Sequence, residues 1–175
     1  IKIALTQLIQ KFGEKPLRGD VCVLLGSLRE STGENDSAIA MFHRAMALAP
    51  HRLGTIESYL TFLARMSSES KVNELLTRLS RDYRWNQELI RRCIENAVRQ
   101  LPEPAGFRLL ALSEPFVKNE FGGLGWLGAQ YHSIKRSSEA LKCFRESTKH
   151  PTANADDWLR YALHVAVSGD FDDAV

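Results

Sequence analysis

Cysteine is scarce in this sequence, which has three among 175 residues. Cys22, Cys93 and Cys143 form no C-x-x-C pair, and this spacing excludes a disulfide framework and the usual zinc clusters. Each cysteine lies inside an apolar helical pattern, so we expect a small buried hydrophobe at each position. Sparse, unpaired cysteines fit a reducing compartment, and we therefore expect a cytoplasmic protein.

The sequence also lacks an excess of one charge and long apolar runs. Its 23 basic and 21 acidic residues leave a net charge of +2, whereas a nucleic-acid footprint shows as a clustered basic excess. No run reaches the roughly 18 consecutive apolar residues of a membrane-spanning helix. We therefore expect neither a nucleic-acid partner nor membrane insertion. The aromatic content of 9% favours a folded domain over disorder, and a chain that begins at Ile1 is interpreted as part of a longer protein.

Motifs of catalytic and cofactor sites are missing or out of context. The stretch Gly123–Gly128 matches G-x-G-x-x-G, but that fingerprint binds a pyrophosphate only after a buried strand, and no strand is predicted here. None of the five histidines has another His or Cys three or four residues away, and no H-E-x-x-H or G-x-S-x-G motif occurs. We predict no catalytic residue, metal site or cofactor in this chain.

Small and apolar residues recur at a spacing of 34 along the whole chain. Ala38 and Ala140 stand in similar segments and lie 102 residues apart, which is three times 34. The same spacing predicts small or apolar residues at the intervening positions and beyond both ends. The sequence satisfies this prediction in the series Ala4, Ala38, Val72, Gly106, Ala140 and Ala174, and in the series Leu8, Phe42, Leu76, Leu110 and Phe144.

These residues give the chain a resemblance to the tetratricopeptide repeat (TPR) family, whose pattern is W-x2-L-G-x2-Y … A-x3-F … P. Residues 19–52 match it at Leu25, Gly26, Ala38, Phe42 and Pro50, and residues 121–154 match it at Leu127, Gly128, Tyr131, Ala140 and Phe144. The resemblance implies an all-α fold, an α-solenoid of tandem helix–turn–helix repeats in a TPR-like superhelix. It implies one domain over 1–175, with full repeats at 19–52, 53–86, 87–120 and 121–154 and partial repeats at 1–18 and 155–175.

Each repeat is predicted to hold two amphipathic helices, because its apolar residues follow a helical period. Gly33 and Gly169 are expected to be left-handed C-terminal caps. Asn35 or Asp36 is expected to cap the helix that follows. We expect helices near 1–12, 20–32, 36–48, 53–66, 69–83, 86–101, 104–117, 121–134, 137–149 and 155–168, and another starting near 171.

The repeat at 87–120 is the irregular one. Its prolines are expected to shorten or bend its second helix, and the glycines that follow are expected to loosen the start of the next helix. The residues concerned are Pro102, Pro104 and Pro115, and then Gly122, Gly123 and Gly125.

A binding surface follows from the resemblance, because in TPR proteins the first helix of each repeat lines a concave groove. Arg92, Trp126 and Arg160 take the same position in three successive repeats, and two guanidinium groups beside an aromatic ring would hold a peptide with an acidic or carboxylate group. The alternative is that Trp126 packs between helices and the arginines form a solvated face. The predicted partner-binding residues are Arg65, Arg91, Arg92, Glu95, Arg99, Trp126, His132 and Arg160.

The leading functional hypothesis is a protein–protein interaction scaffold that binds a peptide or partner domain in this groove, and not an enzyme. The alternative is a regulatory or substrate-recruiting arm of a larger enzyme whose catalytic domain lies outside this chain. Self-association through an exposed repeat end is a third hypothesis.

Overall fold

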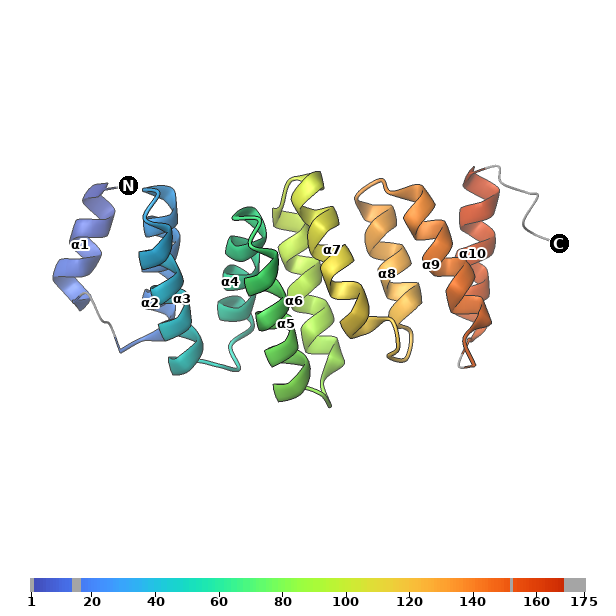
Figure 1. The fold of residues 1–175 in the computed structure, drawn as a ribbon, viewed down its shortest axis with the longest axis horizontal. Helices are drawn as coiled ribbons and strands as arrows, with labels where there is room; N and C mark the ends of the chain where they lie inside the picture. The colour runs from blue at the N-terminus through green and yellow to red at the C-terminus, as the bar shows by residue number, and fades with distance from the viewer. Residues whose placement is uncertain (1, 14–16, 152, 169–175) are drawn as a thin grey trace. The chain divides into compact units, whose positions relative to one another are not determined.

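A computed structural model of the protein describes residues 2–13, 17–151 and 153–168. These residues form ten α-helices and no strand, so the all-helical class predicted from the sequence is confirmed for them (Figure 1). The helices are α1 (Lys2–Phe12), α2 (Gly19–Ser31), α3 (Asn35–Leu48), α4 (Leu53–Arg65), α5 (Glu69–Asp82), α6 (Gln87–Gln100), α7 (Glu103–Val117), α8 (Gly123–Ser133), α9 (Ser137–Lys149) and α10 (Ala155–Ser168).

The ten predicted helices have their observed counterparts, with ends that differ by at most two residues. The predicted cap at Gly169 and the helix expected near 171 lie outside the described residues. The chain divides into two compact units, Ile1–Ser68 and Glu69–Val175, called unit 1 and unit 2 below.

Unit 1 is built from α1 to α4, and apolar side chains hold its helices together. Leu5, Leu8 and Ile9 of α1 pack against a buried cluster that α2 and α3 form. Between α3 and α4, the Phe42 ring stacks on Tyr59 with ring centroids 5.4 Å apart. Burial of an aromatic side chain contributes about 1.5–3 kcal/mol, so the buried Phe42 ring stabilises the packing of α3 against α4.

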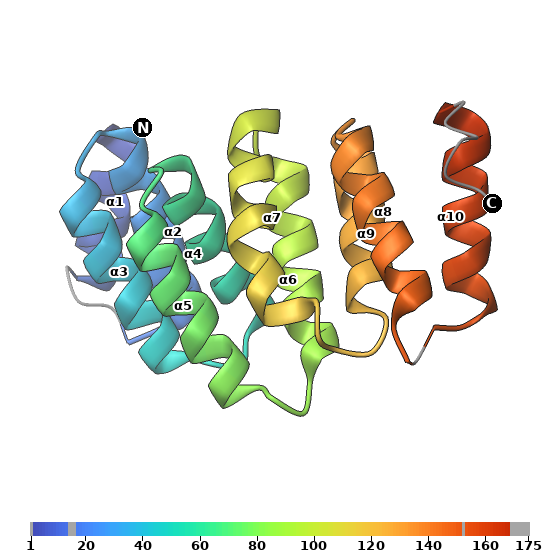
Figure 2. The ribbon, with the colours of Figure 1, turned by 45° about the vertical axis from the view of Figure 1, so that its right-hand side comes forward.

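Unit 2 contains α5 to α10, and helices adjacent in sequence pack together from α5 to α10 (Figure 2). Helix α5 also contacts α7, which belongs to the next helix pair. The largest fully buried side chains of unit 2 come from α5, α6 and α7, namely Leu76, Leu79, Ile90, Ile94, Leu109 and Leu110. All-helical packing of this kind follows from amphipathic helices that are each too small to bury an apolar stripe alone.

The turns inside three helix pairs have the same backbone geometry at the 34-residue spacing. Gly33, Ser67 and Lys135 all have positive φ, at 82°, 53° and 63°. After each of them, the next residue donates its N–H to a carbonyl five residues back: Glu34 to Arg29, Ser68 to Leu63 and Arg136 to Tyr131, with N···O distances of 2.9, 3.2 and 2.9 Å. This pattern is the Schellman motif, which satisfies the last carbonyls of a helix. The predicted cap at Gly33 is confirmed.

The corresponding turn at Leu101 departs from this geometry because a proline follows. Leu101 is extended, with φ −99° and ψ 149°. A proline disfavours helical backbone in the residue before it, and Pro102 has no N–H to donate to the preceding helix. The α6–α7 turn therefore has an extended residue where the other three turns have a left-handed one.

Two glycines allow the helices of a pair to approach closely, at the same repeat position in each unit. A Cβ atom added to Gly26 would lie 3.0 Å from the Phe42 ring, and one added to Gly128 would lie 2.6 Å from the Phe144 ring. Both approaches are closer than ordinary van der Waals contact, so the phenylalanine takes the space that a side chain would fill.

Several local expectations from the sequence were wrong. Helix α3 begins at Asn35, and Glu34 stands at its N-cap without a side-chain hydrogen bond, so neither Asn35 nor Asp36 is the cap. The prolines do not shorten α7, which spans 15 residues and contains Pro115, and the alternative expectation of a bend stays a prediction. Pro104 lies in its first turn, where a missing N–H removes no helical hydrogen bond.

Gly122 and Gly123 have specific structural roles at the start of α8, whereas the sequence predicted that they would loosen it. Gly122 has a φ of 65° and is the N-cap of α8. A Cβ atom on Gly123 would lie 1.7 Å from the Val117 carbonyl oxygen, so this turn is a close backbone approach that requires glycine.

We expect Gly128→Ala to lower the free energy of unfolding by about 1–3 kcal/mol, because the new methyl group displaces the Phe144 ring. Gly106→Ala is the matched control in the same unit. Its new Cβ would meet Val98 at 3.5 Å, an ordinary contact, so the better helix propensity of alanine should stabilise the protein by about 0.5–1 kcal/mol. Urea unfolding followed by circular dichroism at 222 nm measures both. Equal effects of the two substitutions would contradict the close packing.

Two substitutions at the left-handed turns of unit 1 should change the stability of the protein in opposite directions. Gly33→Ala should destabilise by about 1–2 kcal/mol, because left-handed backbone is costly for a residue with a Cβ. Ser67→Gly should stabilise by about 0.5–1 kcal/mol by relieving the same strain. The urea midpoints should move in opposite directions at an unchanged m value. Movement in the same direction would exclude the shared turn geometry.

Candidate functional site

Two cavities in unit 2 lie on either side of the C-terminal half of α8. The α6–α8 cavity has a volume of about 680 Å³ and is lined by Glu95, Val98, Arg99, Leu101, Glu103, Gln130, Ser133, Ile134, Lys135 and Arg136. The α8–α10 cavity has a volume of about 270 Å³ and is lined by Ala129, His132, Phe144, Arg160, Leu163, His164 and Val167. The first has residues of α6 and α8 in its walls, and the second has residues of α8 and α10.

Helix α8 serves both cavities because its side chains alternate between them. Ala129 and His132 are three residues apart and face the α8–α10 cavity. Gln130 and Ser133 have the same spacing, are displaced by one residue, and face the α6–α8 cavity. Residues three apart share one face of a helix, so the two cavities occupy neighbouring faces of α8.

The α6–α8 cavity lies between the irregular turn and a regular one. Leu101 and Glu103 come from the turn that Pro102 holds extended, and Lys135 and Arg136 come from the left-handed turn after α8. Leu101, which precedes Pro102 in this turn, therefore forms part of the edge of the cavity.

Most charges around the α6–α8 cavity are already paired. Arg99 bonds to Glu95 one turn earlier on α6. Arg136 lies 3.7 Å from Glu103 and 3.1 Å from Glu139, and its guanidinium group covers the Phe107 ring at 4.0 Å. Lys135 is exposed and has no ion pair with the described residues. The cavity is thus lined by three cations and two acids, with one cation uncommitted.

Ion pairing around Arg136 affects the neighbouring carboxylate. The Ser138 hydroxyl and the Arg136 guanidinium lower the pKa of Glu139, with the hydroxyl as the larger cause. Glu139 is therefore fully ionised near neutral pH, and it holds Arg136 at the cavity edge.

Gln130 is the buried polar group of the α6–α8 cavity. Its side chain is 9% exposed, and within the described residues its amide makes no hydrogen bond. Neither of its amide atoms is among the buried side-chain atoms that lack a partner, so the amide meets water in the cavity. Gln130 therefore has both a donor and an acceptor available inside the cavity.

The α8–α10 cavity is mainly apolar and has a histidine at its base. His164 is 7% exposed, and its Nε2 lies 3.0 Å from the Ser137 carbonyl oxygen, so Nε2 carries the proton that it donates. The His132 ring meets His164 edge to face, with centroids 5.2 Å apart. The hydrogen bond to the Ser137 carbonyl oxygen fixes the orientation of the His164 ring. The His164 ring in turn supports the His132 ring, which lines the cavity.

Four of the predicted partner-binding residues line these cavities. Glu95 and Arg99 border the α6–α8 cavity, and His132 and Arg160 border the α8–α10 cavity. The structure brings these four to neighbouring faces around α8. Arg160 also pairs with Asp156 on its own helix, at 3.3 Å.

The other four predicted residues line neither cavity. Arg65 belongs to unit 1 and pairs with Glu30 at 3.1 Å. Arg92 is exposed and pairs with Glu88 at 3.5 Å, and Trp126 is half-buried. Exposed pairs of this kind contribute about 0–1 kcal/mol, so Arg92 and Arg65 remain available to other anions.

Arg91 has an intramolecular role. Its guanidinium group donates to the Phe121 carbonyl oxygen at 2.7 Å, and it ties α6 to the turn before α8. Burial lowers the pKa of Arg91, although not enough to remove its charge. The residue positions the glycine turn from which α8 begins.

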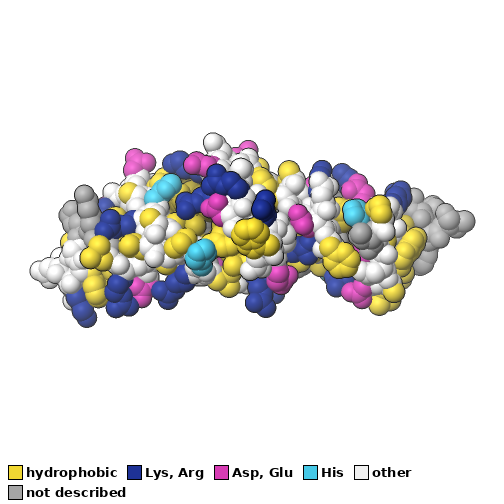
Figure 3. Space-filling view, turned by 90° about the horizontal axis from the view of Figure 1, so that it is seen from below, with side chains coloured by type: hydrophobic (Ala, Val, Ile, Leu, Met, Phe, Trp, Pro, Cys, Tyr) yellow, Lys and Arg dark blue, Asp and Glu magenta, His cyan; other side chains and the backbone are white. Residues whose placement is uncertain are grey.

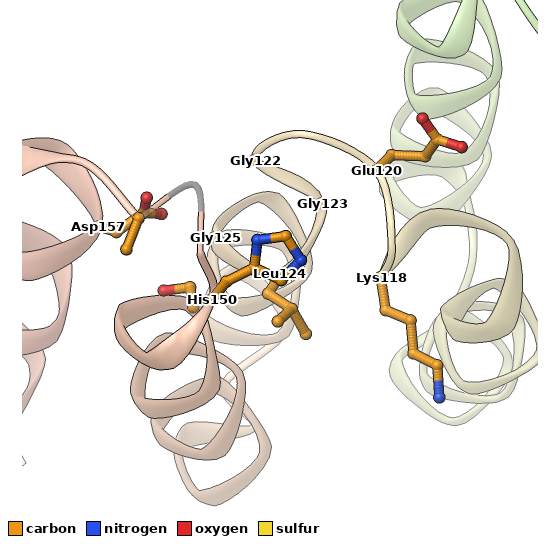
Figure 4. Close-up of a pocket in the computed structure, with 10 residues that line it drawn as sticks. Lys118, Glu120, Gly122, Gly123, Leu124, Gly125, His150 and Asp157 are labelled. Carbon is orange, nitrogen blue, oxygen red and sulfur yellow. The ribbon is translucent and has the colours of Figure 1, made fainter.

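That glycine turn encloses only a very small space. The pocket bordered by Gly122, Gly123 and Gly125 has a volume of about 10 Å³, which is room for one water molecule. Figure 4 shows Asp157 on one side of the turn and Lys118 and Glu120 on the other. Among the described residues α7 and a turn precede it, and no strand does, so the pyrophosphate-binding context of G-x-G-x-x-G is missing.

The glycine at 125 has a structural reason instead. A Cβ atom there would lie 2.8 Å from the Asp157 carboxylate. That carboxylate accepts from the Asn154 N–H at 3.0 Å, while the Asn154 side chain accepts from the Asp157 N–H at 3.2 Å. This reciprocal pair is a capping box at the start of α10.

The cysteines are buried, as predicted from their apolar surroundings. Cys22 and Cys93 are 0% exposed and Cys143 is 6% exposed. Burial raises the pKa of Cys143 to about 12, so its thiol stays protonated and unreactive at neutral pH.

Gln130 and Lys135 line the α6–α8 cavity, but the groove positions of the TPR family do not include them. A signal was present for each. The residues at the repeat position of Gln130 change from apolar to polar along the chain, in the order Leu28, Phe62, Asn96, Gln130 and His164. Lys135 stands where Gly33 and Ser67 stand, and a long cation is unusual at a left-handed turn.

Comparison with known proteins gives no match to a family model and none to a curated protein sequence. None of the helices in the described residues has the length and apolar character that a membrane crossing requires. Across those residues, no three His, Cys, Asp or Glu side chains are grouped so as to hold a metal ion. On the face drawn in Figure 3, basic and acidic side chains are interspersed. The two cavities beside α8 are therefore the candidate binding sites.

Proposed function

We propose that this protein is an interaction scaffold whose helix pairs form a TPR-like solenoid and whose first helices bind a peptide or partner domain. In this proposal the segment is not an enzyme, and its partner is a protein and not a nucleic acid. The supporting observation is the pair of cavities that successive first helices, α6, α8 and α10, border in unit 2.

The repeat interpretation is supported by local geometry that recurs at the family's spacing. The three left-handed turns and the two glycine–phenylalanine contacts occupy equivalent positions in different repeats. A sequence of this kind builds similar helix pairs, and similar pairs present equivalent faces.

The cavities are better suited to binding a polypeptide than to catalysing a reaction. Their walls combine apolar side chains with a few charged and amide groups, which is the usual composition of a recognition site. Among the described residues of this unit, the titratable groups with raised pKa include Tyr83, Tyr131 and Cys143, and these three line neither cavity. Arg92 and Trp126 would extend the binding surface along α6 and α8.

Site-specific photo-crosslinking tests this proposal. A benzophenone amino acid at Ser133 or Leu163 places the probe in each cavity in turn, and the same amino acid at Lys142 or Glu146 places it on exposed positions of α9. After irradiation in native extract, both cavity probes should give the same covalent partner, identified by mass spectrometry. The α9 probes should give none. Equal yields from α9, or no crosslink from either cavity, would contradict a binding role for this face.

A further inference from the structure

We infer that one end of unit 2 binds the surface of an anionic lipid bilayer through two exposed aromatic rings and the cations beside them. Trp85 lies in the turn between α5 and α6, and Phe121 lies in the turn between α7 and α8. Figure 2 shows both turns at the same end of the helices of unit 2. These two residues, with Arg84 and Lys118, are called the aromatic edge below. The inference goes beyond the proposed function, because the aromatic edge lines neither cavity beside α8.

The two rings of the aromatic edge are widely open to solvent. Trp85 is 79% exposed and Phe121 is 69% exposed. The indole N–H of Trp85 makes no hydrogen bond to the described part of the chain. An indole has an apolar body and one polar group, which suits a membrane–water interface where one side is apolar and the other is wet. Two such rings at one end of the unit indicate a surface that they enter.

Hydrogen bonds fix the turns that carry the rings. The Asn86 N–H donates to the Tyr83 carbonyl oxygen at 2.8 Å, the Asn86 side chain accepts from the Leu89 N–H at 3.2 Å, and the Tyr83 side chain is buried. The Phe121 carbonyl oxygen accepts from Arg91 at 2.7 Å. Because about 8 Å of helix separates Asn86 from Arg91, the two turns are neighbours. The rings therefore project from adjacent, ordered backbone.

The charge that is left unmatched at this end of unit 2 is positive. Figure 3 is seen from this end, with hydrophobic side chains among basic and acidic ones. The acids here have cationic neighbours, namely Arg78 and Arg81 for Asp82, Arg92 for Glu88, and Arg91 for Glu120. Arg84 and Lys118 have no ion pair with the described residues, and the Arg84 guanidinium lies 5.1 Å from the centroid of the Trp85 ring. Unmatched cations beside the rings would be attracted to an anionic leaflet.

A bilayer surface fits this arrangement better than a folded partner. Both rings project from turns, and a protein that bound them would need a separate pocket for each ring. The headgroup region of a bilayer is flat and admits any projecting ring. The guanidinium and ammonium groups beside the rings would pair with the phosphates and carboxylates of the headgroups. The binding is peripheral, because only the rings enter the headgroup region and the helices stay outside it.

Cosedimentation with lipid vesicles tests this inference. The probes are vesicles of phosphatidylcholine alone and vesicles of phosphatidylcholine and phosphatidylserine in equal parts. The protein should bind the mixed vesicles at least about tenfold more tightly than the phosphatidylcholine vesicles, because two unmatched cations face the anionic surface. Added salt should weaken the binding to the mixed vesicles.

Substitutions at the aromatic edge separate the rings from the charges. Trp85→Ser and Phe121→Ser should each weaken binding to the mixed vesicles about tenfold, whereas Trp85→Phe should retain most of it. Arg84→Gln and Lys118→Gln should each weaken binding about fivefold and reduce its salt dependence. All four side chains are exposed, so the urea midpoint of each variant should stay unchanged.

Two controls and one optical signal locate the contact. Trp158→Ser removes an exposed ring from α10 and Lys142→Gln removes an exposed charge from α9, and neither should change the binding. Brominated phosphatidylcholine in the mixed vesicles should quench the tryptophan fluorescence of the protein. This quenching should be mostly lost in Trp85→Phe and retained in Trp158→Phe.

The inference is overturned if the protein does not bind the mixed vesicles, if it binds both kinds of vesicle equally, or if the two serine variants of the aromatic edge bind as well as the unaltered protein. A benzophenone amino acid in place of Trp85 tests the competing assignment. A protein crosslinked there in native extract, without any vesicle binding, would assign the aromatic edge to a protein partner. None of these outcomes decides the proposed function, whose probes lie in the cavities at Ser133 and Leu163.

Discussion

The left-handed turn that joins the two helices of a pair is the constraint on which the rest of this structure depends. At Gly33, Ser67 and Lys135 it satisfies the last carbonyls of the first helix and directs the chain into the second. A residue with a Cβ adopts this backbone at a cost, and the protein accepts it at two of the three positions. Because the turn recurs at the repeat spacing, it makes the helix pairs alike.

The α6–α7 turn, which departs from this geometry, borders the α6–α8 cavity. Pro102 removes the N–H that would close the α6–α7 turn and keeps Leu101 extended. Leu101 and Glu103 then form one edge of the α6–α8 cavity, and the regular turn at Lys135 forms another. This local irregularity thus lies beside the cavity, while the turn after α8 on its other edge stays left-handed.

Much of this could be predicted from the sequence, because helical periodicity and turn residues act locally. The spacing of 34 placed every described helix to within two residues, and the glycine at 33 indicated its turn. The partner-binding residues stay a prediction, because the sequence identified helix faces but not how deeply each side chain is buried. Arg91 faces a backbone carbonyl, and Gln130 is buried beside a cavity. Both facts depend on how helices distant in sequence pack, which periodicity does not report.

The prolines and glycines near residues 100–125 were harder to interpret for the same reason. A proline near a helix start and one in a helix interior have opposite effects, and the difference is a matter of one or two residues. Gly123 and Gly125 are required by the Val117 carbonyl and the Asp157 carboxylate, which approach from other elements.

A crystal structure of this chain is the most direct test of the repeated turn and of the cavity beside the α6–α7 turn. The account predicts positive φ at Ser67 and Lys135, an extended Leu101, and an open space between α6 and α8 beside the Gln130 amide. Negative φ at both positions, or an α6–α8 space filled by packed side chains, would contradict it.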